Sequence, residues 1–113
     1  EYAGRWFDMI GLKSSPYMTF NLRVKETMQE YIPAITHVDG TCRIQTVNKE
    51  ENFHYYNLIK TFYINTKVPI LLNTSFNLAG DPIVETAKQA MVSLKKSDLY
   101  YVYFPDVDML VVK

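Results

Sequence analysis

A helical stripe followed at once by a short apolar run is the feature that most restricts the fold of this chain. The stripe consists of apolar residues at the i, i+3, i+4, i+7 spacing of an amphipathic helix, namely Tyr55, Leu58, Ile59 and Phe62. This spacing predicts a helix over about residues 50–65. Val68–Leu72 is continuously apolar, as is typical of a strand covered on both faces. We therefore expect the stripe to pack on a sheet that contains this strand.

The rest of the chain continues this alternation of strands and helices. Thr86 and Gln89 have the spacing of a capping box, which predicts the start of a second helix. Alternating or apolar residues predict strands at 17–24, 42–47, 99–104 and 108–112, the last two joined by a turn at Pro105-Asp106. Short helices at 2–10 and 25–31 and a short strand at 35–38 complete the prediction. The fold class is α/β, with helices packed on a mixed sheet.

Composition restricts the function. The 113 residues suit one domain, and 12 basic residues balance 12 acidic ones, which argues against general binding to nucleic acid. No apolar run approaches the roughly 20 residues of a membrane span, so no membrane partner is expected. The single Cys42 cannot form an internal disulfide, which favours a cytoplasmic location and a small buried thiol.

The first candidate site follows the apolar run. Its polar residues are Asn73, Thr74, Ser75 and Asn77, arranged around Phe76. Hydroxyl, amide and backbone N–H groups at a strand end suit a phosphate or a carbonyl-bearing ligand. The alternative is an ordinary turn, in which Asn and Ser close local hydrogen bonds.

The second candidate site is the stretch His37-Val38-Asp39-Gly40-Thr41-Cys42-Arg43. Gly40 permits a tight turn, and Arg43 suits two-point contact with phosphate. If Cys42 faces inward, Arg43 faces outward. His37 and Asp39 suit acid–base chemistry, but two such residues are too few for a metal site. The alternative is a hairpin-like turn with a solvated arginine.

Two long motifs occur together in this chain, "HVDGTCRIQTVNKEEN" and, after a helix, "VPILLNTSFNLAGDPIVET". Their order and separation resemble the C-terminal domain of the carbamoyltransferase family, which includes nodulation-factor and antibiotic-biosynthesis O-carbamoyltransferases. The resemblance runs from about Tyr2 to Leu110 and is strongest over residues 33–86. It departs from the family pattern at Cys42, where alanine is favoured.

The resemblance implies a YrdC-like α/β domain, whole or truncated, over residues 1–113. In the family this domain uses ATP, with Mg²⁺, to activate carbamoyl phosphate as carbamoyl adenylate. A larger N-terminal domain of the actin-like ATPase superfamily, which carries a metal site, then passes the carbamoyl group to a substrate hydroxyl. The expected partners are therefore carbamoyl phosphate, a small-molecule acceptor and that N-terminal domain. The alternative function is a truncated module that binds nucleotide or phosphate without chemistry. A role in tRNA threonylcarbamoylation is a third reading, which zero net charge disfavours.

The resemblance also assigns residues. Arg43 is the expected catalytic residue, and the expected ATP- and substrate-binding residues are His37, Asp39, Gly40, Thr41, Arg43, Asn73, Thr74, Ser75 and Asn77. Phe76 is expected to turn inward as an anchor. We expect Arg43 and residues 73–77 to face one concave site. The family also has a basic stretch before the position of Glu1, so little turnover is expected from the isolated chain.

Overall fold

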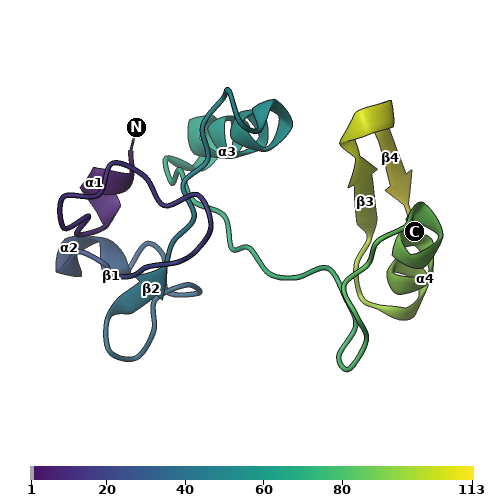
Figure 1. Ribbon diagram of the computed structural model, residues 1–113, viewed down its shortest axis with the longest axis horizontal. Coiled ribbons are helices and arrows are strands. Elements are labelled where there is room, and N and C mark those ends of the chain that lie inside the picture. Colours follow the sequence, from purple (N-terminus) through teal and green to yellow (C-terminus); the bar gives the residue numbers. More distant parts are fainter. Residues whose placement is uncertain (1) are drawn as a thin grey trace. The chain divides into compact units, whose positions relative to one another are not determined.

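The computed structural model describes residues 2–113, which fall into two compact units, Glu1–Leu72 and Asn73–Lys113. The first unit contains α1 (Ala3–Trp6), β1 (Asn21–Arg23), α2 (Glu26–Gln29), β2 (Thr41–Arg43) and α3 (Phe53–Thr66) (Figure 1). The second contains α4 (Ala87–Lys96), β3 (Tyr101–Phe104), the 3₁₀ helix η1 (Pro105–Val107) and β4 (Met109–Val112). The α/β class is confirmed. The single mixed sheet is replaced by two antiparallel pairs, β1–β2 and β3–β4.

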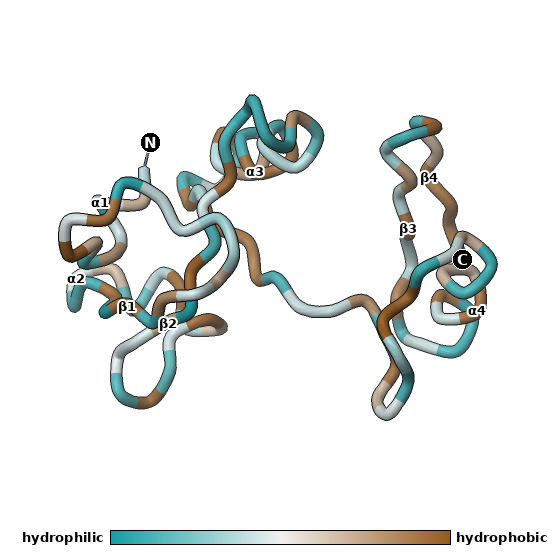
Figure 2. Tube along the Cα trace, in the orientation of Figure 1, coloured by the Kyte–Doolittle hydropathy of each residue, from teal (hydrophilic) through white to brown (hydrophobic). Residues whose placement is uncertain are grey.

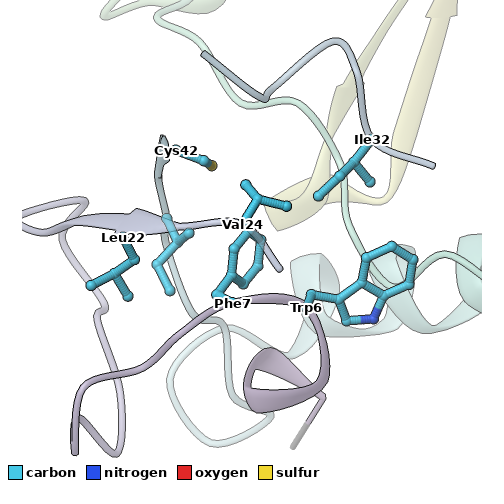
Figure 3. Packing of buried hydrophobic residues seen from close by; sticks show 7 residues of the cluster. Trp6, Phe7, Leu22, Val24, Ile32 and Cys42 are labelled. Carbon is cyan, nitrogen blue, oxygen red and sulfur yellow. The ribbon is translucent and has the colours of Figure 1, made fainter. Parts of the chain in front are cut away.

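The core of the first unit lies on the inner face of the β1–β2 pair. Leu22 is the register partner of Cys42, and both are buried. They pack with five other buried side chains: Trp6, Phe7, Val24, Ile32 and Ile44 (Figure 3). Burial raises the pKa of the Cys42 thiol, so this cysteine is a small buried hydrophobe, as predicted.

Helix α3 is confirmed at Phe53–Thr66, and its N-cap is Asn52, whose side chain accepts a hydrogen bond from the Tyr55 N–H. Its predicted packing is wrong. The helix has no buried residue, and Phe62 is 37% exposed. The run Val68–Leu72 forms no strand. Val68 and Ile70 instead pack against the core of the first unit from a segment that belongs to no helix or strand.

The second unit follows the prediction more closely. Thr86 and Gln89 form the capping box that begins α4, and β3 and β4 pair as an antiparallel hairpin around η1. Leu94 of α4 is buried with Ala90 and Val102. Figure 2 shows hydrophobic residues along β4, of which only Val111 packs against this core.

Three short elements differ from the prediction. The first helix is confined to Ala3–Trp6, residues 35–38 form turns in place of a strand, and β2 ends at Arg43. The first helix ends where Phe7 forms an antiparallel bridge with Val24, a contact between distant residues that periodicity alone does not reveal. None of the helices in residues 2–113 has both the length and the apolar character needed to cross a membrane.

Candidate functional site

The outward face of the β1–β2 pair carries two arginines. Side chains alternate between the faces of a strand, so burial of Leu22 and Cys42 leaves Arg23 and Arg43 on the opposite face. In the antiparallel register Arg43 stands opposite Asn21, and Arg23 stands opposite Thr41. Directly opposed residues have Cβ atoms about 4.5–5.5 Å apart. This face therefore brings two guanidinium groups and two neutral polar side chains together.

Arg23 was missed in the sequence analysis. The predicted strand over residues 17–24 already placed Leu22 and Val24 on one face, which would put Arg23 on the other. What the sequence did not show was the antiparallel partner, which sets Arg23 beside the turn that precedes Arg43.

Gly40 shapes that turn. Its φ is +76°, in the left-handed region that favours glycine. Its N–H donates to the His37 carbonyl at 2.8 Å, and its carbonyl accepts from the Val24 N–H at 2.9 Å. A Cβ at this position would lie 3.1 Å from Gln29 Nε2 and 3.7 Å from Arg23 Nη1. The turn is therefore crowded chiefly by the Gln29 side chain, with the Arg23 guanidinium at ordinary contact distance.

The hydroxyl of Thr41 is the centre of a polar network. It donates to Asp39 Oδ1 at 2.6 Å, accepts from Asn21 Nδ2 at 3.0 Å, and lies 3.1 Å from His37 Nδ1. A hydroxyl has one proton and two lone pairs. Since its proton goes to the Asp39 carboxylate, the contact with His37 requires a proton on Nδ1. When the imidazole is neutral, Nε2 is then its acceptor nitrogen.

Asp39 organises the turn as a carboxylate. Its pKa lies below the usual value because the Thr41 hydroxyl and the Thr41 N–H both donate to Oδ1, with His37 adding a smaller effect. A carboxylate repels phosphate. The role of Asp39 is therefore to hold Thr41 in place and, through Thr41, His37. Arg23 and Arg43 are the groups suited to bind an anion.

Arg43 is held on the face by the backbone of an earlier segment. Its Nε and Nη2 groups both donate to the carbonyl of Met18, at 3.4 and 3.2 Å. A guanidinium has five N–H donors in a fixed plane. The bonds to Met18 fix the orientation of that plane and leave donors on the Nη1 side for a ligand oxygen.

The polar loop at residues 73–77 belongs to the second unit. The Ser75 hydroxyl donates to Asn77 Oδ1, and Asn77 Nδ2 donates to the carbonyls of Leu78 and Asp81 at 3.1 and 3.0 Å. Asn73, Thr74 and Ser75 are exposed. Phe76 is half-buried and packs against the core of that unit, as predicted for the anchor. Ser75 and Asn77 therefore form hydrogen bonds within the loop, and these bonds order the loop in the absence of a ligand.

The structure thus brings together one of the two predicted groups, namely His37, Asp39, Gly40, Thr41 and Arg43. It adds Asn21 and Arg23 to them. The other group, Asn73, Thr74, Ser75 and Asn77, lies in the second unit. A pocket shared by both groups stays a prediction. Across residues 2–113, no three or more His, Cys, Asp or Glu side chains gather as ligands for a metal ion.

Comparison with known proteins adds a family. The family model described as "Carbamoyltransferase C-terminus" matches residues 1–112. The chain is 42% identical over 100 residues to nodulation protein NolO of Bradyrhizobium diazoefficiens, covering 88% of the chain and 18% of NolO. It is 40% identical over 100 residues to nodulation protein NolNO of Sinorhizobium fredii, covering 88% of the chain and 15% of NolNO. It is also 42% identical over 90 residues to the uncharacterised protein MJ1051 of Methanocaldococcus jannaschii, covering 80% of the chain and 18% of MJ1051. The chain therefore spans under a fifth of the length of each of these relatives.

Proposed function

Because this chain belongs to the carbamoyltransferase C-terminus family, we propose that it is the part of an O-carbamoyltransferase that activates the carbamoyl group with ATP. The family match over residues 1–112 is the observation that carries this proposal. The paired arginines on the outward face of β1–β2 support it, because both ATP and carbamoyl phosphate are polyanions that need fixed cations.

The proposed reaction makes carbamoyl adenylate. Atom balance requires that water first releases inorganic phosphate from carbamoyl phosphate, leaving carbamate. A carbamate oxygen then attacks the α-phosphorus of ATP, the new C–O–P linkage forms, and pyrophosphate leaves. The carbamoyl group is next transferred to a substrate hydroxyl with release of AMP, a step that we assign to a further domain of the actin-like ATPase type.

The residues of the first unit have distinct roles in this proposal. Arg43 contacts the α-phosphate and is the catalytic residue, since a guanidinium fixed in advance stabilises the charge that builds up during attack. Arg23 binds a neighbouring phosphate oxygen. His37, Gly40 and Thr41 shape the turn beside them, and Asp39 fixes Thr41. Mg²⁺ would arrive on the triphosphate, since it retains waters and binds mainly through phosphate oxygens.

The loop of the second unit is proposed to contribute to the same chemistry. Thr74 offers an exposed hydroxyl and Asn73 an amide group for the carbamoyl or phosphate oxygens, while the hydrogen bonds of Ser75 and Asn77 hold the loop in shape. We place the reaction in the cytoplasm, where ATP is abundant and where a reduced thiol such as Cys42 is stable.

Release of pyrophosphate tests the proposal. The full-length protein is incubated with ATP, Mg²⁺ and carbamoyl phosphate, and pyrophosphate is measured with a coupled assay. We expect release that requires carbamoyl phosphate. Absence of release despite tight binding of ATP would instead favour a module that binds nucleotide without chemistry.

A further inference from the structure

The hairpin of β3 and β4 is apolar on both of its faces. On the inner face Val102 and Val111 are register partners that pack in the core formed with α4 (Figure 1). Because side chains alternate along a strand, the residues next to these two lie on the outer face. That face carries four side chains in two register pairs: Tyr101–Val112 and Tyr103–Leu110. All four are exposed, and neither strand contains a charged residue.

The β1–β2 pair shows how this chain builds a sheet face that meets solvent. Its inner face is buried, and its outer face holds only polar or charged side chains: Asn21, Arg23, Thr41 and Arg43. The β3–β4 pair lacks that difference between its faces. Continuously apolar strands are typical of sheets that are covered on both sides, and clustered exposed apolar side chains mark surfaces for interaction. The outer face of β3–β4 therefore has the character of a docking surface.

The one hydrogen bond on this face is compatible with burial. The hydroxyl of Tyr103 donates to Asp108 Oδ1 at 2.8 Å. Asp108 follows η1 in the turn that joins the two strands, so its carboxylate lies at the end of the hairpin. A covering segment can bury the ring of Tyr103 without leaving its hydroxyl unpaired, and an unpaired buried hydroxyl would be costly.

The size of the face decides between two kinds of partner. A whole aromatic side chain buries about 150–250 Å², so the four partly exposed side chains offer roughly 400–500 Å² together. A stable interface between separate proteins buries about 800 Å² on each partner. The face is therefore too small to hold a second copy of the chain by itself. A segment of the same polypeptide needs less area, because its tether keeps it at a high effective concentration.

The dimensions of the hairpin suit a helix. Strands of four residues are about 13 Å long, which equals about nine residues of helix. A helix about 10 Å wide also spans two strands that lie about 4.8 Å apart. On the inner face, α4 has 10 residues and supplies the buried Ala90 and Leu94. The relatives have the polypeptide for a second such helix, since the match covers 18% of NolO and 15% of NolNO.

We propose that the outer face of β3–β4 is the docking surface for an amphipathic helix of the same polypeptide, from the part of the full-length protein outside residues 1–113. The helix packs apolar side chains on Tyr101, Tyr103 and Leu110, and the hairpin becomes the middle layer between two helices. This inference goes beyond the proposed function, because the proposed reaction uses none of these side chains.

Thiol labelling tests whether the face is covered. Leu110→Cys and Ile83→Cys are made separately in the full-length protein, and reaction with a thiol reagent is followed at each site by mass spectrometry of peptides. Ile83 is the matched control, since it lies in the second unit outside the hairpin and is 63% exposed, against 57% for Leu110. A docked helix must open before the reagent reaches position 110. We therefore expect Leu110→Cys to react at least about tenfold more slowly than Ile83→Cys.

Photochemical cross-linking identifies what covers the face. Tyr101 is replaced with p-benzoylphenylalanine, an aromatic residue that keeps the ring in place, and the full-length protein is irradiated. We expect a product of monomer mass in which this position is joined to an apolar segment outside residues 1–113. Within that segment, the cross-linked residues should recur every three or four positions, as on one face of a helix.

Several results would overturn the docking surface. Equal labelling rates for Leu110→Cys and Ile83→Cys would show that the face is open to solvent. A cross-linked product of dimer mass would assign the face to a second copy, and a cross-link confined to residues 1–113 would assign it to this domain itself. Absence of a cross-link would likewise count against a docked helix. The proposed carbamoyl activation would be unaffected in each case, because release of pyrophosphate tests it separately.

Discussion

At the scale of single residues, the Thr41 hydroxyl decides the state of its neighbours. It is the atom through which Asp39, Asn21 and His37 are connected. Because Asp39 is fully exposed, solvent would otherwise leave its carboxyl group unordered. The two hydrogen bonds from Thr41 hold it in place and lower its pKa below 3.8.

We therefore predict that Thr41→Val raises the pKa of Asp39 toward 3.8. The substitution removes the hydroxyl, whose hydrogen bond lowers this pKa most, and leaves the hydrogen bond from the backbone N–H. A carboxyl group with a lowered pKa stabilises the folded state above its unfolded pKa, and this contribution is lost as pH falls through the folded pKa. The stability difference between wild type and Thr41→Val should accordingly shrink as pH falls below 3.8. NMR titration of the Asp39 carboxyl carbon measures the shift directly. An unchanged pKa would mean that the hydroxyl contact does not persist in solution.

Sequence reasoning at this scale succeeded where one strand was sufficient. Alternation placed Cys42 inside and Arg43 outside, and both assignments are confirmed. It missed Arg23 because the importance of that side chain depends on the register between β1 and β2. Arg23 and Thr41 are 18 positions apart in the sequence, but this register sets them opposite each other.

At the scale of elements, helices were predicted better than strands. Helices α3 and α4 carry local signals, namely a stripe, an Asn cap and a capping box, and local hydrogen bonds suffice to form them. The run Val68–Leu72 has the composition of a strand, but a strand exists only where another pairs with it. Val68 and Ile70 still pack against the core, but they are only partly buried and Leu72 is 66% exposed, so the predicted cover on both faces is also wrong.

The end of α3 offers a stability test. Lys67 caps this helix with φ of +66°, and its N–H bonds the Tyr63 carbonyl. A side chain in the left-handed region costs roughly 1–2 kcal/mol, which glycine avoids. We expect Lys67→Gly to stabilise the protein by about 1 kcal/mol after the greater chain entropy of glycine is subtracted, a rise in Tm of about 4–8 °C for a domain of this size.

Ser97 provides the control for that measurement, since it caps α4 with φ of −113°, which any residue adopts. Ser97→Gly should leave Tm unchanged or lower it, because no strain is relieved and chain entropy is added. Equal effects of the two substitutions in a thermal melt would show that backbone conformation at Lys67 is not strained.

At the scale of the whole molecule, the chain consists of two units with separate cores. The first motif lies in the first unit, whereas the second motif begins at Val68 in the first unit and continues into the second. The motifs were recognisable from the sequence because their residue types and spacing are local. The pairing of β1 with β2 was not, since it joins segments separated by the 17 residues between Arg23 and Thr41. The proposed activity therefore rests on the cationic face of the first unit and its family membership.

The decisive prediction for that activity concerns Arg43. In the full-length protein, Arg43→Ala should lower carbamoyl-phosphate-dependent pyrophosphate release by about 10²–10³-fold, the cost of removing one donor that is fixed toward developing charge. The fold should survive, because Arg43 is exposed and its neighbours Cys42 and Ile44 supply the core contacts. Circular dichroism and thermal melts check the fold, and the coupled assay measures the rate.

Two further variants separate charge from geometry. Arg43→Lys keeps the positive charge but loses the planar fork that is held against Met18, so its rate should fall between those of wild type and Arg43→Ala. Arg5→Ala removes an exposed arginine that belongs to α1 and to neither strand of the β1–β2 pair, and should react as wild type does. If Arg43→Ala and Arg5→Ala release pyrophosphate at the same rate, Arg43 is only a solvated strand residue, and the cations that stabilise the α-phosphate must be sought elsewhere in the protein.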